Sequence, residues 1–184
     1  GITSVYHCAA LISFNPKQKK KIMKTNVEGT ANIVNLCLAH KVAKLCHVSS
    51  VVTLGDAPKN ESIKENNIWV DGPLNSNYAI SKHKSELEVW RGIEEGLNAV
   101  IINPSIILGP GKWDKGSSLV FQKIWNGLSF YTSGSNGFVD VRDVASIMIQ
   151  LMKSPISSER FILSSECLPF KIILDYIADY FGRK

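Results

Sequence analysis

Long apolar runs are missing from this sequence, and its few cysteines are unpaired. No stretch of about 18 apolar residues occurs, so we predict no transmembrane helix and no membrane partner. The cysteines form no Cys-x-x-Cys pair and no histidine lies at zinc-finger spacing from them, so we predict no metal site. Free thiols, and no recognisable signal peptide, are typical of a reducing compartment, and we predict a cytoplasmic protein. The cysteines are Cys8, Cys37, Cys46 and Cys167.

The sequence also has only a small excess of positive over negative charge. The 21 Lys and Arg against 16 Asp and Glu leave a formal charge of +5. One cluster accounts for this excess: Lys17, Lys19, Lys20, Lys21 and Lys24. A nucleic-acid-binding face spreads basic residues along a surface and interleaves aromatic residues among them. The cluster therefore predicts a solvated helix start, and we predict no nucleic-acid partner.

What the sequence does contain is an alternation of strand and helix patterns. Its 184 residues, 45% of them apolar and 20% charged, can bury a sizeable core. Short apolar runs predict buried strands at 5–10, 45–48 and 99–102, and apolar residues at helical spacing predict helices over 17–40 and 78–95. This order predicts an α/β fold with a parallel sheet that helices cover on both faces.

The helix over 78–95 follows a loop that we predict at 55–77, where Asn, Pro, Gly, Asp and Lys are frequent. Polar side chains at 75–77 offer an N-cap for this helix. Its predicted buried stripe consists of Leu87, Trp90, Ile93 and Leu97.

The pattern changes after Gly109. The elements predicted beyond it are a helix at 117–127, strands at 138–141 and 160–163, and helices near 144–152 and 170–181. Asp140 and Asp143 suit the N-cap and the third position of the first of these last two helices, where carboxylates satisfy free amides. We therefore predict that they are not a catalytic carboxylate pair.

The string Tyr-Ala-Ile-Ser-Lys, residues 78–82, carries the clearest chemical signal. On a helix, Tyr78 and Lys82 lie one turn apart on the same face. A free tyrosine has a pKa of about 10, and a neighbouring ammonium favours the phenolate and lowers that pKa. The pair predicts a general acid/base that moves a proton on or off a hydroxyl or carbonyl oxygen. Taken alone, the string also fits a solvated helix face.

Two serines strengthen this prediction. Ser49 and Ser50 directly follow the strand at 45–48, which places a hydroxyl at the carboxyl edge of the sheet. Open parallel sheets bind their ligands at that edge, although serines there also suit an ordinary turn. The order Ser50, Tyr78, Lys82, each at a strand end or helix start, favours a catalytic site over coincidence.

Six motifs occur in order between Val5 and Met152: VYHCAA, NVEGT, HVSS, YAISK, NPSIILGPG and FVDVRDVA. With them the sequence resembles the extended short-chain dehydrogenase/reductase family, and within it the NAD-dependent epimerase/dehydratase group. The form NPSIILGP is similar to the dihydroflavonol reductase and 3β-hydroxysteroid dehydrogenase branch. The resemblance implies a Rossmann-like, doubly wound parallel sheet that lacks its first strands. Residues 1–108 would be the carboxyl-side part of a dinucleotide-binding domain, and 109–184 part of a small α/β substrate-binding region with a strand and helix that return to the main domain.

The resemblance also implies roles for single residues. Tyr78 would be the catalytic acid/base, Lys82 would hold the nicotinamide ribose and lower the tyrosine pKa, and Ser50 would bind the substrate oxygen. Ser49 is the alternative for the role of Ser50. Further contacts to NAD or NADP would come from small residues and a strand end: Cys8, Ala9, Ala10, Ser49, Asn103, Pro104 and Ser105.

For four more residues the sequence allows both a functional and a structural role. His7 matches a position near the cofactor, but it also suits a packed strand histidine. Asn26 either lines the site or is structural. Trp113 and Tyr131 would stack on a ring-shaped substrate or close a small core.

The function implied by the resemblance is an NAD(P)-dependent oxidoreductase that reduces a carbonyl or oxidises a secondary alcohol of a small molecule. The alternatives are a nucleotide-sugar epimerase or dehydratase with bound NAD, and a non-catalytic cofactor-sensing protein, against which the intact Ser-Tyr-Lys set argues. A homodimer would form through the helices at about 17–40 and 78–95. The glycine-rich phosphate loop of the family does not occur in these residues. We therefore expect a piece of a longer enzyme that is inactive alone.

Overall fold

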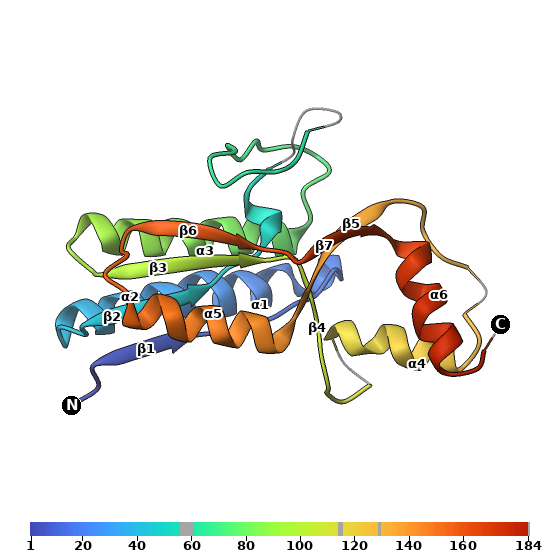
Figure 1. Ribbon diagram of the computed structural model, residues 1–184. Helices are drawn as coiled ribbons and strands as arrows, with labels where there is room; N and C mark the ends of the chain where they lie inside the picture. The colour runs from blue at the N-terminus through green and yellow to red at the C-terminus, as the bar shows by residue number, and fades with distance from the viewer. Residues whose placement is uncertain (56–60, 114–115, 129, 184) are drawn as a thin grey trace. The chain divides into compact units, whose positions relative to one another are not determined.

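The computed structural model describes residues 1–55, 61–113, 116–128 and 130–183 (Figure 1). These residues form two compact units. The first consists of Gly1–Pro104 and Ile147–Ile162, and the second of Ser105–Ser146 and Leu163–Lys184. The predicted division into domains at residue 108 stays a prediction. The predicted loop at 55–77 lies partly outside the described residues.

A four-stranded sheet forms the centre of the first unit. Its strands are β1 (Ser4–His7), β2 (Lys44–Val48), β3 (Ala99–Pro104) and β6 (Glu159–Leu163), in the order β1-β2-β3-β6. β1 and β2 are parallel, as are β2 and β3, so the carboxyl ends of these three strands meet at one edge. The predicted α/β fold with a parallel sheet is confirmed.

Long helices cover one face of this sheet. α1 (Lys19–Met23), a π-helical segment (Lys24–Glu28) and α2 (Gly29–Ala39) follow one another without a break, where the sequence predicted one helix. α3 (Asn77–Glu94) packs beside α2 (Figure 1). The two helices approach closely at Gly92, because a Cβ atom there would lie 2.5 Å from Cγ1 of Val34.

The core between these helices and the sheet is apolar. Its buried members are Val34, Cys37, Val42, Leu45, Val89, Leu97, Ala99 and Ile101. Burying such side chains stabilises the fold by about 25 cal/mol for each Å² of apolar surface removed from water. This core fixes α3, which carries the candidate catalytic residues, on the sheet.

The end of α5 (Val141–Lys153) covers the opposite face. Neighbouring residues of a strand point to opposite faces, and Leu45 packs under α2 and α3. Lys44 therefore points to the other face, where its buried ammonium satisfies three backbone carbonyls at the carboxyl end of α5. The acceptors are Leu151, Ser154 and Ile156, at 2.7, 2.9 and 2.6 Å.

Two strand boundaries differ from the sequence predictions. β1 ends at His7, so Cys8, Ala9 and Ala10 lie after the strand. β3 runs on to Pro104, two residues beyond the predicted end at 102, so Asn103 belongs to the strand. Pairing between neighbouring strands sets both boundaries, and the apolar runs alone do not show it.

The predicted buried stripe of α3 is wrong at Leu87, which is 51% exposed. Trp90 and Ile93 are only partly buried against the core. The face of α3 that turns inward carries mainly small and polar residues: Ala79, Ser81, Lys82, Ser85, Glu86, Val89 and Gly92. Polar groups can be buried there because they are hydrogen-bonded.

The second unit contains a three-stranded sheet in the order β4-β5-β7. β4 (Ile106–Leu108) and β5 (Ser135–Asp140) are parallel, whereas β7 (Glu166–Pro169) is antiparallel to β5. α4 (Leu119–Trp125) and α6 (Phe170–Tyr180) pack against each other. The sequence predicted neither β4 nor β7, because strands this short leave almost no periodic pattern.

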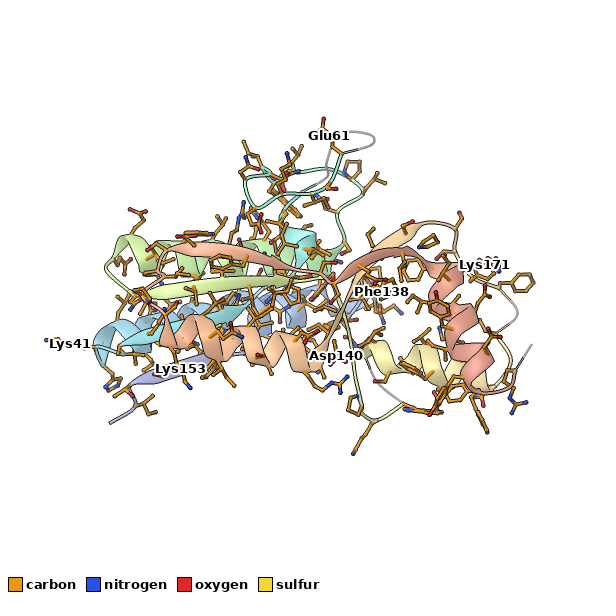
Figure 2. The ribbon with its side chains drawn as sticks, viewed as in Figure 1. Lys41, Glu61, Phe138, Asp140, Lys153 and Lys171 are labelled. Atoms are coloured by element: carbon orange, nitrogen blue, oxygen red, sulfur yellow. The ribbon has the colours of Figure 1, made fainter. Side chains whose placement is uncertain are left out.

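Asp140 lies where β5 ends and α5 begins (Figure 2). Its carboxylate accepts a hydrogen bond from the backbone N–H of Arg142 at 2.8 Å and pairs with the guanidinium of the same residue. Arg142 lowers the pKa of Asp140 to about 2. This geometry agrees with the predicted N-cap role of Asp140.

Membrane-spanning and metal-binding features are both absent from the ranges that the structure describes. None of the helices there is both long and apolar enough to cross a bilayer. In the same ranges, no three His, Cys, Asp or Glu side chains gather so that they could hold a metal ion.

Candidate active site

Ser50 lies directly behind the carboxyl end of β2. The backbone N–H of Ser49 donates to the carbonyl of Ile102 at 2.7 Å, which ties this strand end to β3. Ser50 then caps a single 3-10 turn, Val51–Thr53, because its side-chain oxygen accepts from the N–H of Val52. The strand before Ser50 and the turn after it thus set its position.

Tyr78 and Lys82 lie in the first two turns of α3. The helix begins here because the Ser76 hydroxyl accepts a hydrogen bond from the N–H of Ala79 at 3.1 Å, so the predicted N-cap is confirmed. The side chain of Ser50 lies beside the phenol of Tyr78, where hydrogen bonding between the two lowers the pKa of Tyr78. The structure therefore brings Ser50, Tyr78 and Lys82 to the same edge of the sheet.

Burial raises the pKa of Tyr78 above its usual value of 10, and the hydrogen bond with Ser50 offsets this only in part. The predicted net lowering of the pKa of Tyr78 is therefore wrong for this structure. Desolvation of the phenolate dominates. At neutral pH the phenol of Tyr78 is protonated and is able to give up a proton.

Lys82 is 2% exposed, at the base of the same site. Its ammonium donates a hydrogen bond to the carbonyl of Val48 at 2.8 Å. Burial lowers the pKa of Lys82 from 10.5 to about 8, while the charges of Glu86 and Cys8 oppose this change. Lys82 thus stays positively charged at neutral pH.

Glu86, one turn beyond Lys82, was missed by the sequence analysis. It is 2% exposed, and its Oε2 accepts three hydrogen bonds. The donors are Ser49 Oγ at 2.5 Å, Thr53 Oγ1 at 2.8 Å and Asn103 Nδ2 at 2.9 Å. The signal was present, because Tyr78, Lys82 and Glu86 recur every four residues on one helix face.

The other carboxylate oxygen of Glu86 faces Arg160, a second residue that the sequence analysis missed. Nη1 of Arg160 donates to Oε1 of Glu86 at 3.0 Å, and the indole N–H of Trp90 lies 3.4 Å from the same oxygen. Burial raises the pKa of Glu86, but its hydrogen bonds together outweigh this and hold the pKa below its usual value. Glu86 is therefore an ionised carboxylate in the protein interior.

Cys8, Ala9 and Ala10, which the sequence predicted to contact the cofactor, form an exposed segment after β1. The two alanines carry only a methyl group, so a ligand can come close to their backbone. Burial raises the pKa of the Cys8 thiol and the charge of Lys82 opposes this, which shows that the segment passes near Lys82.

Ser49 and Asn103 lie inside the protein. The hydroxyl of Ser49 donates its hydrogen bond to Glu86, so Ser50 is the serine beside Tyr78. The amide of Asn103 donates to the carbonyl of Ser50 at 3.1 Å and to Glu86, and among the described residues its Oδ1 has no partner. Neither side chain reaches the surface.

Pro104 and Ser105 are the last two residues that the sequence predicted to contact the cofactor. Pro104 is buried at the end of β3. Ser105 belongs to the second unit, where its hydroxyl donates to the carbonyl of Leu163 at 3.1 Å. Contacts of both residues to a cofactor stay predictions.

His7 and Asn26 make contacts that favour structural roles. Nε2 of His7 lies 2.9 Å from the hydroxyl of Thr30, as a packed strand histidine would. Asn26 is 1% exposed in the π-helical segment, and its amide pairs with both the N–H and the carbonyl of Leu11, at 2.7 and 3.0 Å. It also donates to Ser81 of α3 at 2.9 Å.

Trp113 and Tyr131 belong to the second unit. The ring of Trp113 packs on those of Phe121 and Phe181, with centroids 6.2 and 5.4 Å apart, which favours the small-core interpretation for this residue. Tyr131 is 54% exposed. Its contact with a substrate stays a prediction.

Comparison with known families identifies the class that this fold and site define. The model of the NAD dependent epimerase/dehydratase family matches residues 1–162. The chain belongs to this family, and the resemblance found in the sequence is confirmed. A nicotinamide cofactor is part of the description of the family, which agrees with the predicted cofactor class.

Curated relatives include reductases. Sterol demethylase protein B of Methylococcus capsulatus is 28% identical over 189 residues, which cover 100% of this chain and 56% of the relative. A putative dihydroflavonol 4-reductase of Synechocystis is 26% identical, over 99% of the chain and 55% of the relative. The chain thus spans about half the length of these curated relatives.

Solved structures agree on the Rossmann-like fold. The structure of gox2253 superimposes with a TM-score of 0.88 and 26% identity, over 100% of this chain and 57% of the other. The UDP-glucose 4-epimerase of Thermus thermophilus, solved in complex with NAD, gives a TM-score of 0.84 at 22% identity, over 100% and 63%. The second likeness shows the fold alone.

Proposed function

We propose that the protein carrying this chain is an NAD(P)-dependent oxidoreductase that reduces a carbonyl, or oxidises a secondary alcohol, of a small molecule. The observation that carries this proposal is the meeting of Ser50, Tyr78 and Lys82 at the carboxyl edge of a parallel sheet. Ser50 follows β2, Tyr78 and Lys82 lie one turn apart at the start of α3, and the ammonium of Lys82 reaches the carbonyl at the end of β2. The relative from Synechocystis, named a reductase, supports the same reaction.

The residues at this edge fit NAD or NADP. Among the described residues, the carbonyl of Val48 is the one acceptor for the three N–H groups of Lys82, which leaves two donors for the hydroxyls of a ribose. The exposed Ala9 and Ala10 leave room for a ligand beside the backbone. When bound, the nicotinamide ring would supply or accept a hydride.

Tyr78 would supply the proton for reduction. Because its pKa is raised, the phenol carries a proton at neutral pH and would donate it to the substrate oxygen as negative charge develops there. The hydroxyl of Ser50 would hold that oxygen beside Tyr78. The charge of Lys82 would stabilise the phenolate that remains.

The residue beside Tyr78 suggests the kind of substrate. Phe14 is 72% exposed, and its ring meets that of Tyr78 edge-on with centroids 6.0 Å apart. An exposed ring at this place would contact an apolar or aromatic group next to the reacting carbon.

A second candidate function is that of a nucleotide-sugar epimerase or dehydratase that keeps NAD through its cycle. The family description, which covers epimerases and dehydratases, supports it. Turnover without net change in the cofactor would favour this candidate over the reductase.

We also propose a homodimer through α1–α2 and α3. Leu36 on α2 and Leu87 on α3 support it, because these large apolar side chains are 54% and 51% exposed. Sedimentation of Leu36→Glu and Leu87→Glu would then show monomers, and unchanged sedimentation of both variants would exclude this interface.

The function is tested in the complete protein, after a screen of ketones and aldehydes with NADH and NADPH has found a substrate. Tyr78→Phe removes only the phenol hydroxyl, so turnover falls by about 10²–10⁴-fold while cofactor binding is unchanged. Lys82→Met lowers turnover and also weakens cofactor binding. Tyr6→Phe, which changes an exposed tyrosine of β1, is the control and alters neither turnover nor cofactor binding. Near-normal turnover of Tyr78→Phe would overturn the proposed mechanism.

A further inference from the structure

Glu86 is linked to the backbone carbonyl of Ser50 through the amide of Asn103. The hydroxyl of Thr53 lies 2.9 Å from this carbonyl and 2.8 Å from Oε2 of Glu86. The amide of Asn103 donates to the same two groups, at 3.1 and 2.9 Å. Thr53 has a single hydroxyl proton, which goes to the carboxylate, whereas Asn103 has one N–H for each of the two acceptors, so the carboxylate fixes the orientation of the amide that holds the Ser50 carbonyl in place.

Arg160 connects Glu86 to a distant part of the chain, the segment 61–76 that precedes α3. Besides its bond to Glu86, the guanidinium donates from Nε to the carbonyl of Glu65 at 2.7 Å and from Nη2 to the carbonyl of Asn67 at 3.1 Å. The carboxylate of Glu65 in turn accepts from the N–H of Ile162 at 3.0 Å. One side chain thus joins the segment, β6 and the buried carboxylate.

The same segment also touches the turn that follows Ser50. Gly55 has a φ of +71°, and a Cβ atom there would lie 2.6 Å from the carbonyl oxygen of Ile68. On the helix side, the ring of Trp69 stacks on that of His83, with centroids 4.5 Å apart. The segment is therefore seated against both elements that carry candidate catalytic residues.

We propose that Glu86 is a positioning residue for Ser50, and that Arg160 couples the orientation of the Ser50 hydroxyl to the seating of the segment 61–76. This inference rests on the proposed function, because it assigns Glu86 and Arg160 to the machinery around Ser50 and Tyr78. Neither residue touches the reacting atoms. Glu86 acts through Asn103, whose amide also donates to the Ser50 carbonyl.

The pKa of Tyr78 offers a readout that needs no substrate. The hydrogen bond with Ser50 lowers this pKa, so a misplaced Ser50 hydroxyl raises it. Simple loss of the negative charge of Glu86 acts in the opposite direction, because fewer negative charges favour the phenolate. The direction of the change thus separates positioning from plain electrostatics.

Lys82 needs a control in this experiment. The charge of Lys82 lowers the pKa of both His7 and His47. Glu86 and Cys8 favour the charged form of Lys82, so loss of the Glu86 carboxylate also makes Lys82 easier to deprotonate. A double-mutant cycle with Ser50→Ala removes this effect, because any change carried by Lys82 persists when the Ser50 hydroxyl is gone.

The experiment measures the Tyr78 pKa by NMR of ¹³Cζ-labelled tyrosine in the complete protein, with the signal assigned through Tyr78→Phe. We expect Glu86→Gln, Arg160→Met and Arg160→Lys each to raise the pKa toward its value in Ser50→Ala. In the Ser50→Ala background, Glu86→Gln causes no further rise. Amide exchange in segment 61–76 becomes faster in both Arg160 variants.

Glu88→Gln is the matched control, because it removes a carboxylate from the outer face of α3 that pairs with Arg91. It leaves the Tyr78 pKa unchanged. If Glu86→Gln does not fold, the two Arg160 variants decide, because both leave the buried carboxylate in place. An unchanged or lowered Tyr78 pKa in folded variants overturns the inference, and so does a rise that persists in full without the Ser50 hydroxyl. None of these results depends on turnover, so failure of the proposed function is detected separately.

Discussion

The ammonium of Lys82 donates a hydrogen bond to the carbonyl of Val48, the last residue of β2, at 2.8 Å. This contact joins the start of α3 to the strand end that Ser50 follows. Among the residues that the structure describes, this carbonyl is the one acceptor for Lys82, which compensates a buried cation only in part for the water it has lost. The ammonium of Lys82 therefore loses its proton at moderately alkaline pH, because its pKa is about 8.

The first prediction concerns the stability that this ionisation carries. The pKa of Lys82 is about 8 in the folded chain and 10.5 without burial, so between these values the unfolded state binds more protons. The free energy of unfolding therefore rises with pH across this window, and the gain disappears as the pH falls toward 8. Urea unfolding of the native protein and of Lys82→Met at pH 8 and pH 10 checks this. The native protein gains about 2 kcal/mol relative to the variant, and equal slopes for the two would contradict it.

The second prediction concerns Lys44, which satisfies the carboxyl end of α5 from the strand β2. Lys44→Met keeps the length of the side chain but leaves three carbonyls without their charged donor. The free energy of unfolding falls by about 2 kcal/mol or more, as measured by urea unfolding. Lys153→Met, at an exposed position in the last turn of the same helix, changes it by less than about 0.5 kcal/mol.

The close approach of α2 and α3 gives the third prediction. In Gly92→Ala the new methyl group meets Cγ1 of Val34, a fully buried side chain that is branched at Cβ. The variant loses about 1–3 kcal/mol of stability by overpacking. Gly29→Ala is the control, because a Cβ atom there meets nothing nearer than 4.0 Å, and it gains up to about 1 kcal/mol from helix propensity. Similar thermal midpoints for both variants would refute this account of the helix contact.

The fourth prediction concerns the lysine cluster at the start of α1. Lys19, Lys20 and Lys21 are all exposed, and changing them to Gln alters the free energy of unfolding by less than about 0.5 kcal/mol. Turnover of the complete protein stays near that of the native protein. A large loss of activity, or of a salt-dependent acidic partner, would show that the cluster has a function.

Local signals in the sequence were sufficient to predict most elements of the first unit. The apolar runs located β2 and β3, and the N-cap at Ser76 located α3, within two residues of their observed bounds. The four-residue spacing of Tyr78 and Lys82 requires no knowledge of the rest of the chain. Short-range patterns of this kind depend on geometry that every helix and strand shares.

Glu86 could not be predicted in the same way, because its partners come from distant positions. Ser49 is 37 residues away and Arg160 is 74 residues away in the chain. A glutamate in a helix is normally solvated, so its burial follows only from the simultaneous arrival of donors from the segment after β2, from β3 and from β6. The same set of polar contacts explains why Leu87, and not Glu86, is exposed.

The π-helical segment Lys24–Glu28 contains one residue more than a regular α-helical turn requires. In it, Asn26 clamps the backbone of Leu11 from both sides. Deleting a residue next to Asn26 would let this segment close into a regular α-helical turn, while the turns before and after it keep nearly the same rotation. The helix would then be narrower at Asn26, whose side chain now reaches both Leu11 and Ser81 of α3. The extra residue thus brings the Asn26 amide within reach of two separate segments, and a one-residue deletion here would cost these contacts without turning either flanking helix face away from the core.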